Sequence, residues 1–202
     1  WTYEIVVAAD ACTDGTVALA QAMGARVVQV EHRHIAATRN SGAGAALGEW
    51  LIFVDADTQV TPAAVRAACN NLRKGISAGG ALFRFDRPIP LYVYFIEWAA
   101  WLFCLLSQMS GGCFLYTHRK TFEQVGGFDE RLYAGEELAF AVAAKKVGRF
   151  RVVPHTVVTS GRKVRLYSGR ELLQIVWKIV SQGPRSLTHR GDLDLWYRRR
   201  PD

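Results

Sequence analysis

Gly48–Glu49–Trp50–Leu51–Ile52–Phe53–Val54–Asp55–Ala56–Asp57 is the stretch of sequence that decides the fold. Four large apolar residues, 51–54, end abruptly at two carboxylates that are spaced one residue apart. A continuous apolar run bounded by glycine and by polar residues predicts a buried strand covered on both faces. In open α/β sheets ligands bind beyond the carboxyl ends of such strands, which is where Asp55 and Asp57 fall.

Two interpretations of this Asp-x-Asp pair remain open from the residues alone. Two anionic oxygen ligands suit a hard divalent cation such as Mg²⁺ or Mn²⁺, which keeps several waters and bridges to substrate phosphates. The alternative is that the pair caps a helix beginning at Thr61–Pro62, because Asp and Thr are good N-caps and Pro suits the first turn.

Strands and helices are expected to alternate on both sides of this stretch. Apolar runs predict strands over 4–9, 25–30, 51–54, 77–85, 112–116 and 150–153, with 157–158 as a continuation. Periodic or small-residue segments predict helices over 17–23, 36–47, 62–74, 120–125, 138–147 and 169–181. This order indicates an α/β fold with a mostly parallel sheet flanked by helices.

Composition and charge restrict the partners. The 202 residues fit one domain, 1–165, followed by a C-terminal helix and basic tail over 166–202. A formal charge of +7 favours acidic partners such as phosphates or an anionic membrane. Nucleic acid is not expected, since no RNA-binding motif or interleaved aromatic–basic stripe is present. The four cysteines lack metal spacing, and we expect free thiols in a reducing compartment.

The segment Leu91–Leu106 is apolar nearly all round and contains Glu97. A membrane span needs about 20 residues, and this segment is shorter. Two readings stay open: a buried core helix, or a helix lying in a membrane interface with its Trp and Tyr residues at headgroup level.

Several polar side chains follow the expected strands, where a ligand would lie. Asp10 suits a nucleobase imide or ribose hydroxyl, or simply a helix N-cap. Arg39, which lies beside Asn40, could bind a phosphate or a nucleobase. Glu136 and Glu137 open a helix, where negative charge is favoured, and one of them could accept the acceptor's proton. His155 is a candidate third metal ligand, with a structural histidine as the alternative. The remaining candidates are Asp14 and the basic cluster Arg162, Lys163 and Arg165.

Taken in order, these motifs resemble family 2 glycosyltransferases of the GT-A fold over about residues 4–165. The residues that carry the resemblance are Asp10…Thr13-Asp14-Gly15-Thr16, Arg39-Asn40-x-Gly42…Ala46-x-Gly48, Phe53-Val-Asp55-Ala-Asp57, Gly111-Gly112, Phe122…Gly126-Gly127-Phe128-Asp129-Glu130, Gly135-Glu136-Glu137 and Pro154…Thr159-Ser160-Gly161-Arg162.

The resemblance implies a nucleotide-diphospho-sugar donor, a divalent metal at Asp57, and inversion by single displacement. Asp55 would lie near the ribose or metal and Asp10 at the nucleobase, while Glu137 would be the general base. Substrate contacts are expected from the remaining motif residues Asp14, Arg39, Asn40, Gly111, Gly112, Glu136 and Arg162.

The chain departs from the family pattern at several points. Glu137 stands where the motif usually has Asp, one methylene shorter, and Ala9–Asp10 stands where the family has two acids. The acceptor motif of processive synthases is absent, which argues against a polysaccharide synthase. The family also begins with a strand–helix unit that this sequence lacks. We therefore expect an N-terminally truncated fragment with a gap in its sheet between the strands of Asp10 and Asp55, and an incomplete donor pocket.

The leading hypothesis is an inverting, metal-dependent hexosyltransferase that acts on a hydroxyl acceptor. It would be cytoplasmic and at the membrane surface through Leu91–Leu106 and the basic C-terminal region, a location that suits a lipid-linked acceptor. The alternative hypothesis is a non-catalytic sugar-nucleotide-binding relative with a poor base. The sequence leaves the donor, the acceptor and the oligomeric state open.

Overall fold

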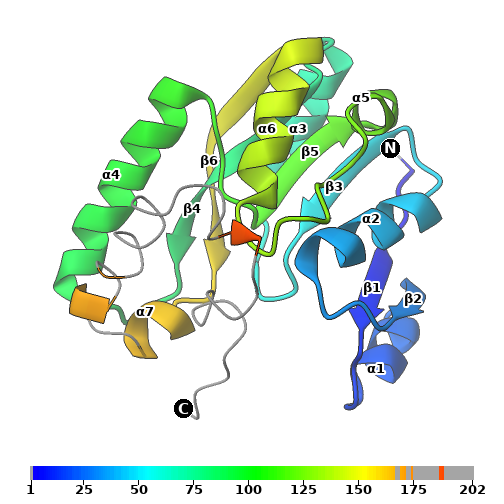
Figure 1. The fold of residues 1–202 in the computed structure, drawn as a ribbon, viewed down its shortest axis with the longest axis horizontal. Helices are drawn as coiled ribbons and strands as arrows, with labels where there is room; N and C mark the ends of the chain where they lie inside the picture. The colour runs from blue at the N-terminus through cyan, green and yellow to red at the C-terminus, as the bar shows by residue number, and fades with distance from the viewer. Residues whose placement is uncertain (1, 167–168, 172–173, 175–186, 189–202) are drawn as a thin grey trace.

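The structure is a computed structural model that describes residues 2–166, 169–171, 174 and 187–188. Figure 1 shows its helices and strands. In chain order they are β1 (Val6–Asp10), α1 (Thr16–Ala22), β2 (Arg26–Val30), α2 (Ile35–Ala45), β3 (Trp50–Val54), α3 (Pro62–Arg73), β4 (Ala78–Phe85), α4 (Leu91–Ser107), β5 (Phe114–His118), α5 (Arg119–Gln124), α6 (Glu136–Val147), β6 (Phe150–Thr159) and α7 (Arg162–Leu166). Of the helix expected over 169–181 only 169–171 and 174 are described, and the basic tail lies outside the described residues.

The strands form two sheets. β1 pairs with β2 in parallel, and the larger sheet has the order β3-β5-β4-β6. The α/β class with flanking helices is confirmed, but the larger sheet is mixed, because β5 runs antiparallel to both β3 and β4 while β4 and β6 are parallel. Among the described residues no pairing joins β1 to β3, so the expected interruption of the sheet lies between the strands of Asp10 and Asp55.

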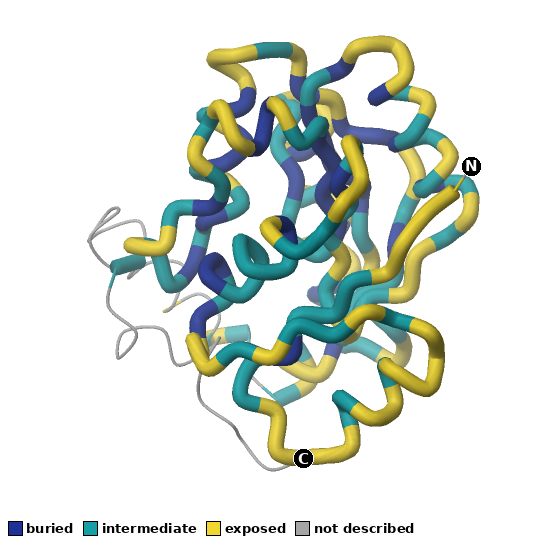
Figure 2. Tube along the Cα trace, turned by 90° about the vertical axis from the view of Figure 1, so that its right-hand side faces the viewer, coloured by how far each residue is buried: buried dark blue, intermediate teal, exposed yellow. Residues whose placement is uncertain are grey.

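Helices cover both faces of the larger sheet, because alternate strand residues point to opposite sides. On one face, residues such as Leu51 and Leu115 pack with α2, α4, α5 and α6 around the aromatic cluster of Phe122, Phe128 and Phe140. On the other face, Phe114 and Tyr116 pack against α3. Figure 2 shows the buried residues gathered in this body, whereas β1, α1 and β2 are mostly intermediate or exposed.

Helix α2 lies close to β1, as its small residues predict. A Cβ on Gly42 would lie 3.4 Å from the Cβ of Ala8. Helix α2 thus carries Arg39 and Asn40 between the two sheets.

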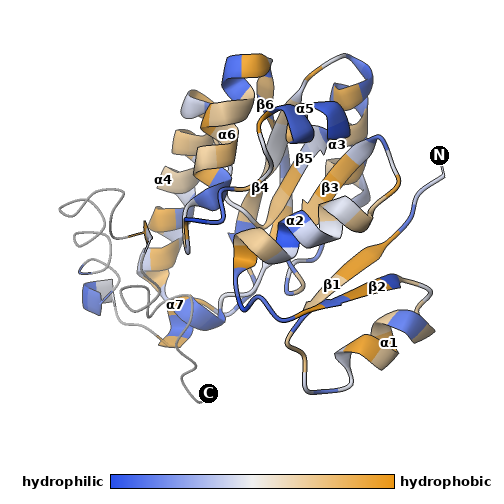
Figure 3. Ribbon diagram, turned by 45° about the vertical axis from the view of Figure 1, so that its right-hand side comes forward, coloured by the Kyte–Doolittle hydropathy of each residue, from blue (hydrophilic) through white to orange (hydrophobic). Residues whose placement is uncertain are grey.

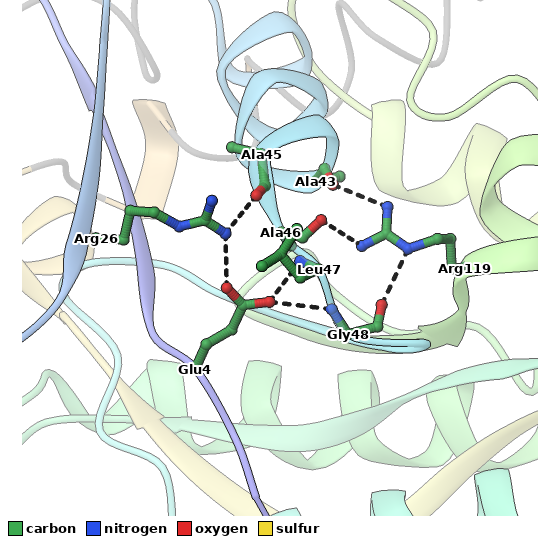
Figure 4. Close-up of polar contacts among 8 residues, drawn as sticks. All are labelled: Glu4, Arg26, Ala43, Ala45, Ala46, Leu47, Gly48 and Arg119. Carbon is green, nitrogen blue, oxygen red and sulfur yellow. Dashed lines mark hydrogen bonds and ion pairs between the residues drawn. The ribbon is translucent and has the colours of Figure 1, made fainter.

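A polar clamp joins the two sheets at the segment that leads from α2 into β3 (Figure 4). The guanidinium of Arg119 donates to the carbonyls of Ala43 (3.2 Å), Ala46 (2.7 Å) and Gly48 (3.0 Å). Glu4 accepts the backbone N–H of Gly48 at 3.0 Å and pairs with Arg26 of β2 at 2.6 Å. The clamp therefore fixes the start of β3, and with it the two aspartates.

Candidate functional site

The Asp55–Asp57 turn is held by hydrogen bonds to the residue before β5 and to the end of β6. The N–H of Asp55 donates to the carbonyl of Cys113 just before β5 (3.3 Å), and Thr58 donates to the Thr159 hydroxyl at the end of β6 (3.0 Å). The same Thr159 hydroxyl donates to Asp57 Oδ1 over 3.5 Å. Helix α3 has its own N-cap, because the Thr61 hydroxyl accepts the N–H of Ala64 at 3.2 Å. The capping role that the sequence left open thus belongs to Thr61.

Arg39 joins this turn to the acidic start of α6. Its Nη2 atom lies 2.7 Å from Asp55 Oδ1, and its Nη1 atom lies 2.6 Å from Glu136 Oε1. The side chains of Arg39 and Glu136 are only 12% and 4% exposed, so water screens their ion pair little, whereas the Asp55 side chain is 40% exposed and its pair with Arg39 is screened more. Burial lowers the pKa of Arg39, but the carboxylates of Asp55, Glu136 and Glu137 outweigh it and raise that pKa, so the guanidinium stays charged.

Two glycines leave room for this arrangement. The carbonyl of Gly112 accepts Arg39 Nη2 at 3.1 Å, and a Cβ on Gly112 would lie 3.0 Å from that same nitrogen. Gly135, directly before α6, has φ +75°, a conformation that other residues adopt only with strain. Gly111 packs against the ring of Phe83 instead of Arg39.

Glu137 titrates near neutrality. Burial is the main cause that raises its pKa to about 7, and the adjacent Glu136 carboxylate adds to it by repulsion between like charges. The positive charge of Arg39 opposes this shift. A carboxylate with a pKa near 7 is suited to accept a proton from a hydroxyl group.

The thiol beside this site is not a nucleophile. Burial, reinforced by the nearby Asp55 carboxylate, raises the pKa of Cys113 to about 12. The thiolate is the reactive form of cysteine, so Cys113 stays inert at neutral pH. All four cysteines are free thiols, as the sequence predicts.

Asp10 lies on β1, where it orders the loop that enters α2. Its carboxylate accepts the N–H groups of Arg33 (2.8 Å) and His34 (3.0 Å) and the hydroxyl of Thr38 (2.7 Å). These bonds outweigh the effect of burial and lower the pKa of Asp10, so it remains ionised. A carboxylate offers about four lone-pair sites, which leaves room for one further donor.

Asn40, expected at the substrate, holds another loop. Its amide donates to the carbonyl of Phe128 (2.9 Å) and to Glu130 (2.8 Å), and its oxygen accepts the N–H of Phe128 (2.9 Å). Asp14 lies in the turn before α1, where it accepts the N–H and hydroxyl of Thr16.

The predicted His155 lies in a bulge of β6. The pairing with β4 jumps from Val153 to Thr156 at this point, and His155 is exposed. In the described part of the chain no three His, Cys, Asp or Glu side chains group as a metal site, so the structure does not bring His155 to the aspartates. The two aspartates alone still fit Mg²⁺ or Mn²⁺, which bind proteins through one or two carboxylates plus substrate phosphates.

Lys163 and His34 become notable only in the folded structure. Arg162 is exposed at the start of α7, whereas the neighbouring Lys163 lies near Asp57 and Asp55. Loss of water around its amine lowers the pKa of Lys163, and the two carboxylates oppose this.

His34 is buried against Tyr133, and its Nε2 has no hydrogen-bond partner within the described residues. In the sequence, Lys163 is only one member of a basic cluster, and no pattern points to His34.

Comparison with known proteins identifies the fold and the family. The model of glycosyl transferase family 2 matches residues 2–153. No curated protein matches the chain.

Solved structures of three proteins share the fold. The mannosyltransferase PcManGT from Pyrobaculum calidifontis, solved with GDP-Man and Mn²⁺, is 19% identical with a TM-score of 0.59, over 96% of this chain and 59% of that one. S. aureus TarS 1-349 with UDP-GlcNAc is 17% identical with a TM-score of 0.61, over 84% and 51%. Glucosyl-3-phosphoglycerate synthase from Mycobacterium tuberculosis, with Mn²⁺, UDP and its product, is 18% identical with a TM-score of 0.60, over 88% and 66%. The chain thus spans between about half and two thirds of these proteins.

Proposed function

The chain belongs to glycosyl transferase family 2, and from this premise we propose that it transfers a sugar from a nucleotide-diphospho-sugar to a hydroxyl acceptor with inversion. The observation that carries this proposal is the continuous chain of ion pairs Asp55–Arg39–Glu136, which ends beside a carboxylate whose pKa is about 7. Donor-side acids and a base for the acceptor are thereby held in one rigid network.

In the proposed reaction the acceptor oxygen attacks the anomeric carbon from the face opposite the diphosphate. The bond between that carbon and the diphosphate oxygen breaks, and Glu137 takes the acceptor's proton. Lys163, near the two aspartates, lies where it can balance charge on the leaving diphosphate. Asp57, with Asp55, would hold a Mg²⁺ or Mn²⁺ ion, which supplies positive charge opposite the phosphates.

The structures of similar proteins support the choice of donor. Those structures contain GDP-Man, UDP-GlcNAc and UDP, and two of them contain Mn²⁺. A hexosyl donor is therefore the proposed class. A lipid-linked hydroxyl compound is the proposed acceptor class, because α4 exposes an apolar surface, analysed below.

The experiment compares wild type, Glu137→Gln, Asp57→Asn and the control Glu123→Gln, an exposed acid on α5. Donor binding is measured by calorimetric titration with UDP-, GDP- and dTDP-sugars, with and without Mn²⁺. Transfer to a hydroxyl acceptor is measured as release of the nucleoside diphosphate. We expect Glu137→Gln to bind donor like wild type but to lose at least about a hundredfold in transfer, as expected for a missing general base.

Asp57→Asn should lose the metal-dependent part of donor binding, and Glu123→Gln should behave like wild type. If the wild type binds the donor but transfers no sugar, and Glu137→Gln leaves donor binding unchanged, the result would favour a non-catalytic sugar-nucleotide-binding relative. Absence of donor binding in the wild type would contradict both functions.

A further inference from the structure

Helix α4 presents an apolar outer face that the rest of the described chain leaves uncovered. The large residues exposed on this face are Leu91, Tyr94, Phe95, Ile96, Trp98, Leu102, Phe103, Leu105 and Leu106. The side chains of Leu106, Phe95 and Trp98 are 77%, 70% and 66% exposed, and no charged residue is exposed on the helix. Figure 3 shows α4 at one edge of the molecule with apolar colours along its length. At about 1.5 Å per residue its 17 residues form a strip about 25 Å long.

The inner face fixes how this strip is presented. Val93, Glu97 and Cys104 are buried. Glu97, the single acid of α4, accepts the N–H of Phe85 at 2.6 Å and pairs with Arg87 at 2.8 Å. The indole N–H of Trp101 donates to the carbonyl of Phe83. These bonds attach α4 to the end of β4, so its outer face points away from the protein.

Basic residues lie at both ends of the strip, but Arg87 and Arg165 at its N-terminal end are ion-paired with Glu97 and Asp86. At the N-terminal end the Arg87 guanidinium lies over the ring of Tyr94, 4.1 Å from its centroid. Arg165 of α7 lies at the same end, 2.8 Å from Asp86 Oδ1. At the C-terminal end Lys145 donates to the carbonyl of Ser107 at 2.6 Å.

We propose that this outer face of α4 lies in the headgroup region of an anionic membrane, with the helix axis parallel to the surface. Aromatic residues are favoured at that depth, and the exposed amine of Lys145 together with the formal net charge of +7 favours an anionic surface. Each basic residue near such a surface contributes binding free energy, so attachment depends on both apolar area and charge. This proposal does not depend on the proposed function.

A second copy of the chain is a poorer occupant. Each copy carries a formal net charge of +7, and repulsion between like-charged copies disfavours association through this face. Within the described residues neither α4 nor another helix has the length and hydrophobicity needed to cross a bilayer.

The test is co-sedimentation of the 202-residue chain with vesicles of phosphatidylcholine alone or mixed with phosphatidylglycerol. Wild type should bind the mixed vesicles, bind the neutral ones more weakly, and dissociate as salt rises. The variant carries Phe95→Gln, Trp98→Gln and Leu106→Gln, since Gln favours a helix and removes apolar area. Removing three large apolar side chains should weaken binding at least about tenfold.

The matched control replaces Leu19, Met23 and Leu47 by Gln, because these residues are similarly exposed but do not belong to α4. It should bind vesicles like wild type. A second measurement needs no variant: lipids with brominated acyl chains should quench tryptophan fluorescence if Trp98 enters the bilayer.

Three results would overturn the proposal: no binding of wild type to anionic vesicles, equal binding by the triple variant, or no quenching. A dimer by light scattering that the triple variant dissociates, without vesicle binding, would assign the face to a second copy. Vesicle binding is measured without donor or acceptor, so failure here leaves the glycosyl-transfer proposal standing and removes only the argument for a lipid-linked acceptor.

Discussion

At the scale of single residues, the protonation state of Glu137 has opposite effects on stability and on the proposed activity. Its neighbours Glu136 and Arg39 belong to the buried network that reaches Asp55. Burial keeps Glu137 protonated up to a pKa of about 7, and its proposed role as a base requires the deprotonated form. Deprotonation of Glu137 as the pH rises should therefore increase activity and decrease stability.

We predict that acceptor kcat/KM rises with pH and levels off above about pH 7, because only ionised Glu137 accepts the proton. A carboxyl whose pKa is higher in the folded than in the unfolded protein binds extra protons when folded. Its contribution to stability is therefore complete below pH 4.5 and is lost as pH rises through about 7. Rate profiles and urea unfolding at several pH values measure the two trends.

Glu137→Gln is the control for both trends, since the amide does not titrate. In this variant any residual kcat/KM should no longer rise with pH. Its free energy of unfolding should also vary less with pH over the same range. If the wild-type rate is instead independent of pH between 5 and 8, Glu137 is not the group that accepts the proton.

At the scale of elements, α2 organises the site as much as the strands do. One turn of this helix sends Arg39 toward Asp55 and α6 and sends Asn40 toward the loop of residues 127–130. The small residues of α2 let it approach β1 closely, which brings Asp10 near the same region.

Asn40 should be a structural residue. Asn40→Ala removes the two hydrogen bonds to the backbone of Phe128 and leaves its N–H and carbonyl without these partners. We expect the free energy of unfolding to fall by about 2 kcal/mol, with a much smaller change in donor affinity.

Urea unfolding and donor titration of the same protein measure the two effects. The comparison is Asn70→Ala, on exposed α3 surface, where Asn70 accepts a 3.3 Å bond from Arg73. It should change stability by less than about 0.5 kcal/mol. A large loss of donor affinity in Asn40→Ala with unchanged stability would restore the substrate-binding role expected from sequence.

At the scale of the whole molecule, the two sheets depend on the polar clamp at residues 43–48 (Figure 4). Arg119, the first residue of α5 directly after β5, donates to three backbone carbonyls of this segment. The β1–α1–β2 part buries few residues of its own, so we expect it to be the less stable part.

We predict that Arg119→Met loosens β1, β2 and α2 while leaving the larger sheet intact. Three carbonyls lose a charged donor, which should lower the local opening free energy by about 2 kcal/mol. Native-state hydrogen exchange measures this as faster exchange at residues 6–10 and 26–30, with little change at 114–118. Arg149→Met, on the exposed residue before β6, is the control. Uniform acceleration across both sheets would show that the molecule opens as one unit.

The sequence alone determined the elements and their order. Continuous apolar runs, glycine ends and capping residues are local signals, so the strands and helices expected over 4–158 lie within a few residues of the observed ones. Helix α7 was not expected, and the helix expected over 169–181 lies mostly outside the described residues. The Asp-x-Asp position at the end of β3 and the acid pair at the start of α6 follow from the same local pattern. The interruption between the strands of Asp10 and Asp55 also agrees with the expectation from the family resemblance.

Only the tertiary structure decided which of these residues meet. Arg39 and Glu136 are 97 positions apart, and no periodicity predicts their 2.6 Å contact. The antiparallel direction of β5 and the inward placement of Glu97 were likewise undetermined, because strand direction and helix rotation depend on long-range packing. Local propensity fixes where an element begins and ends. Which side chains share a site depends on how the elements pack, since contacts between distant segments form only when the whole core is assembled.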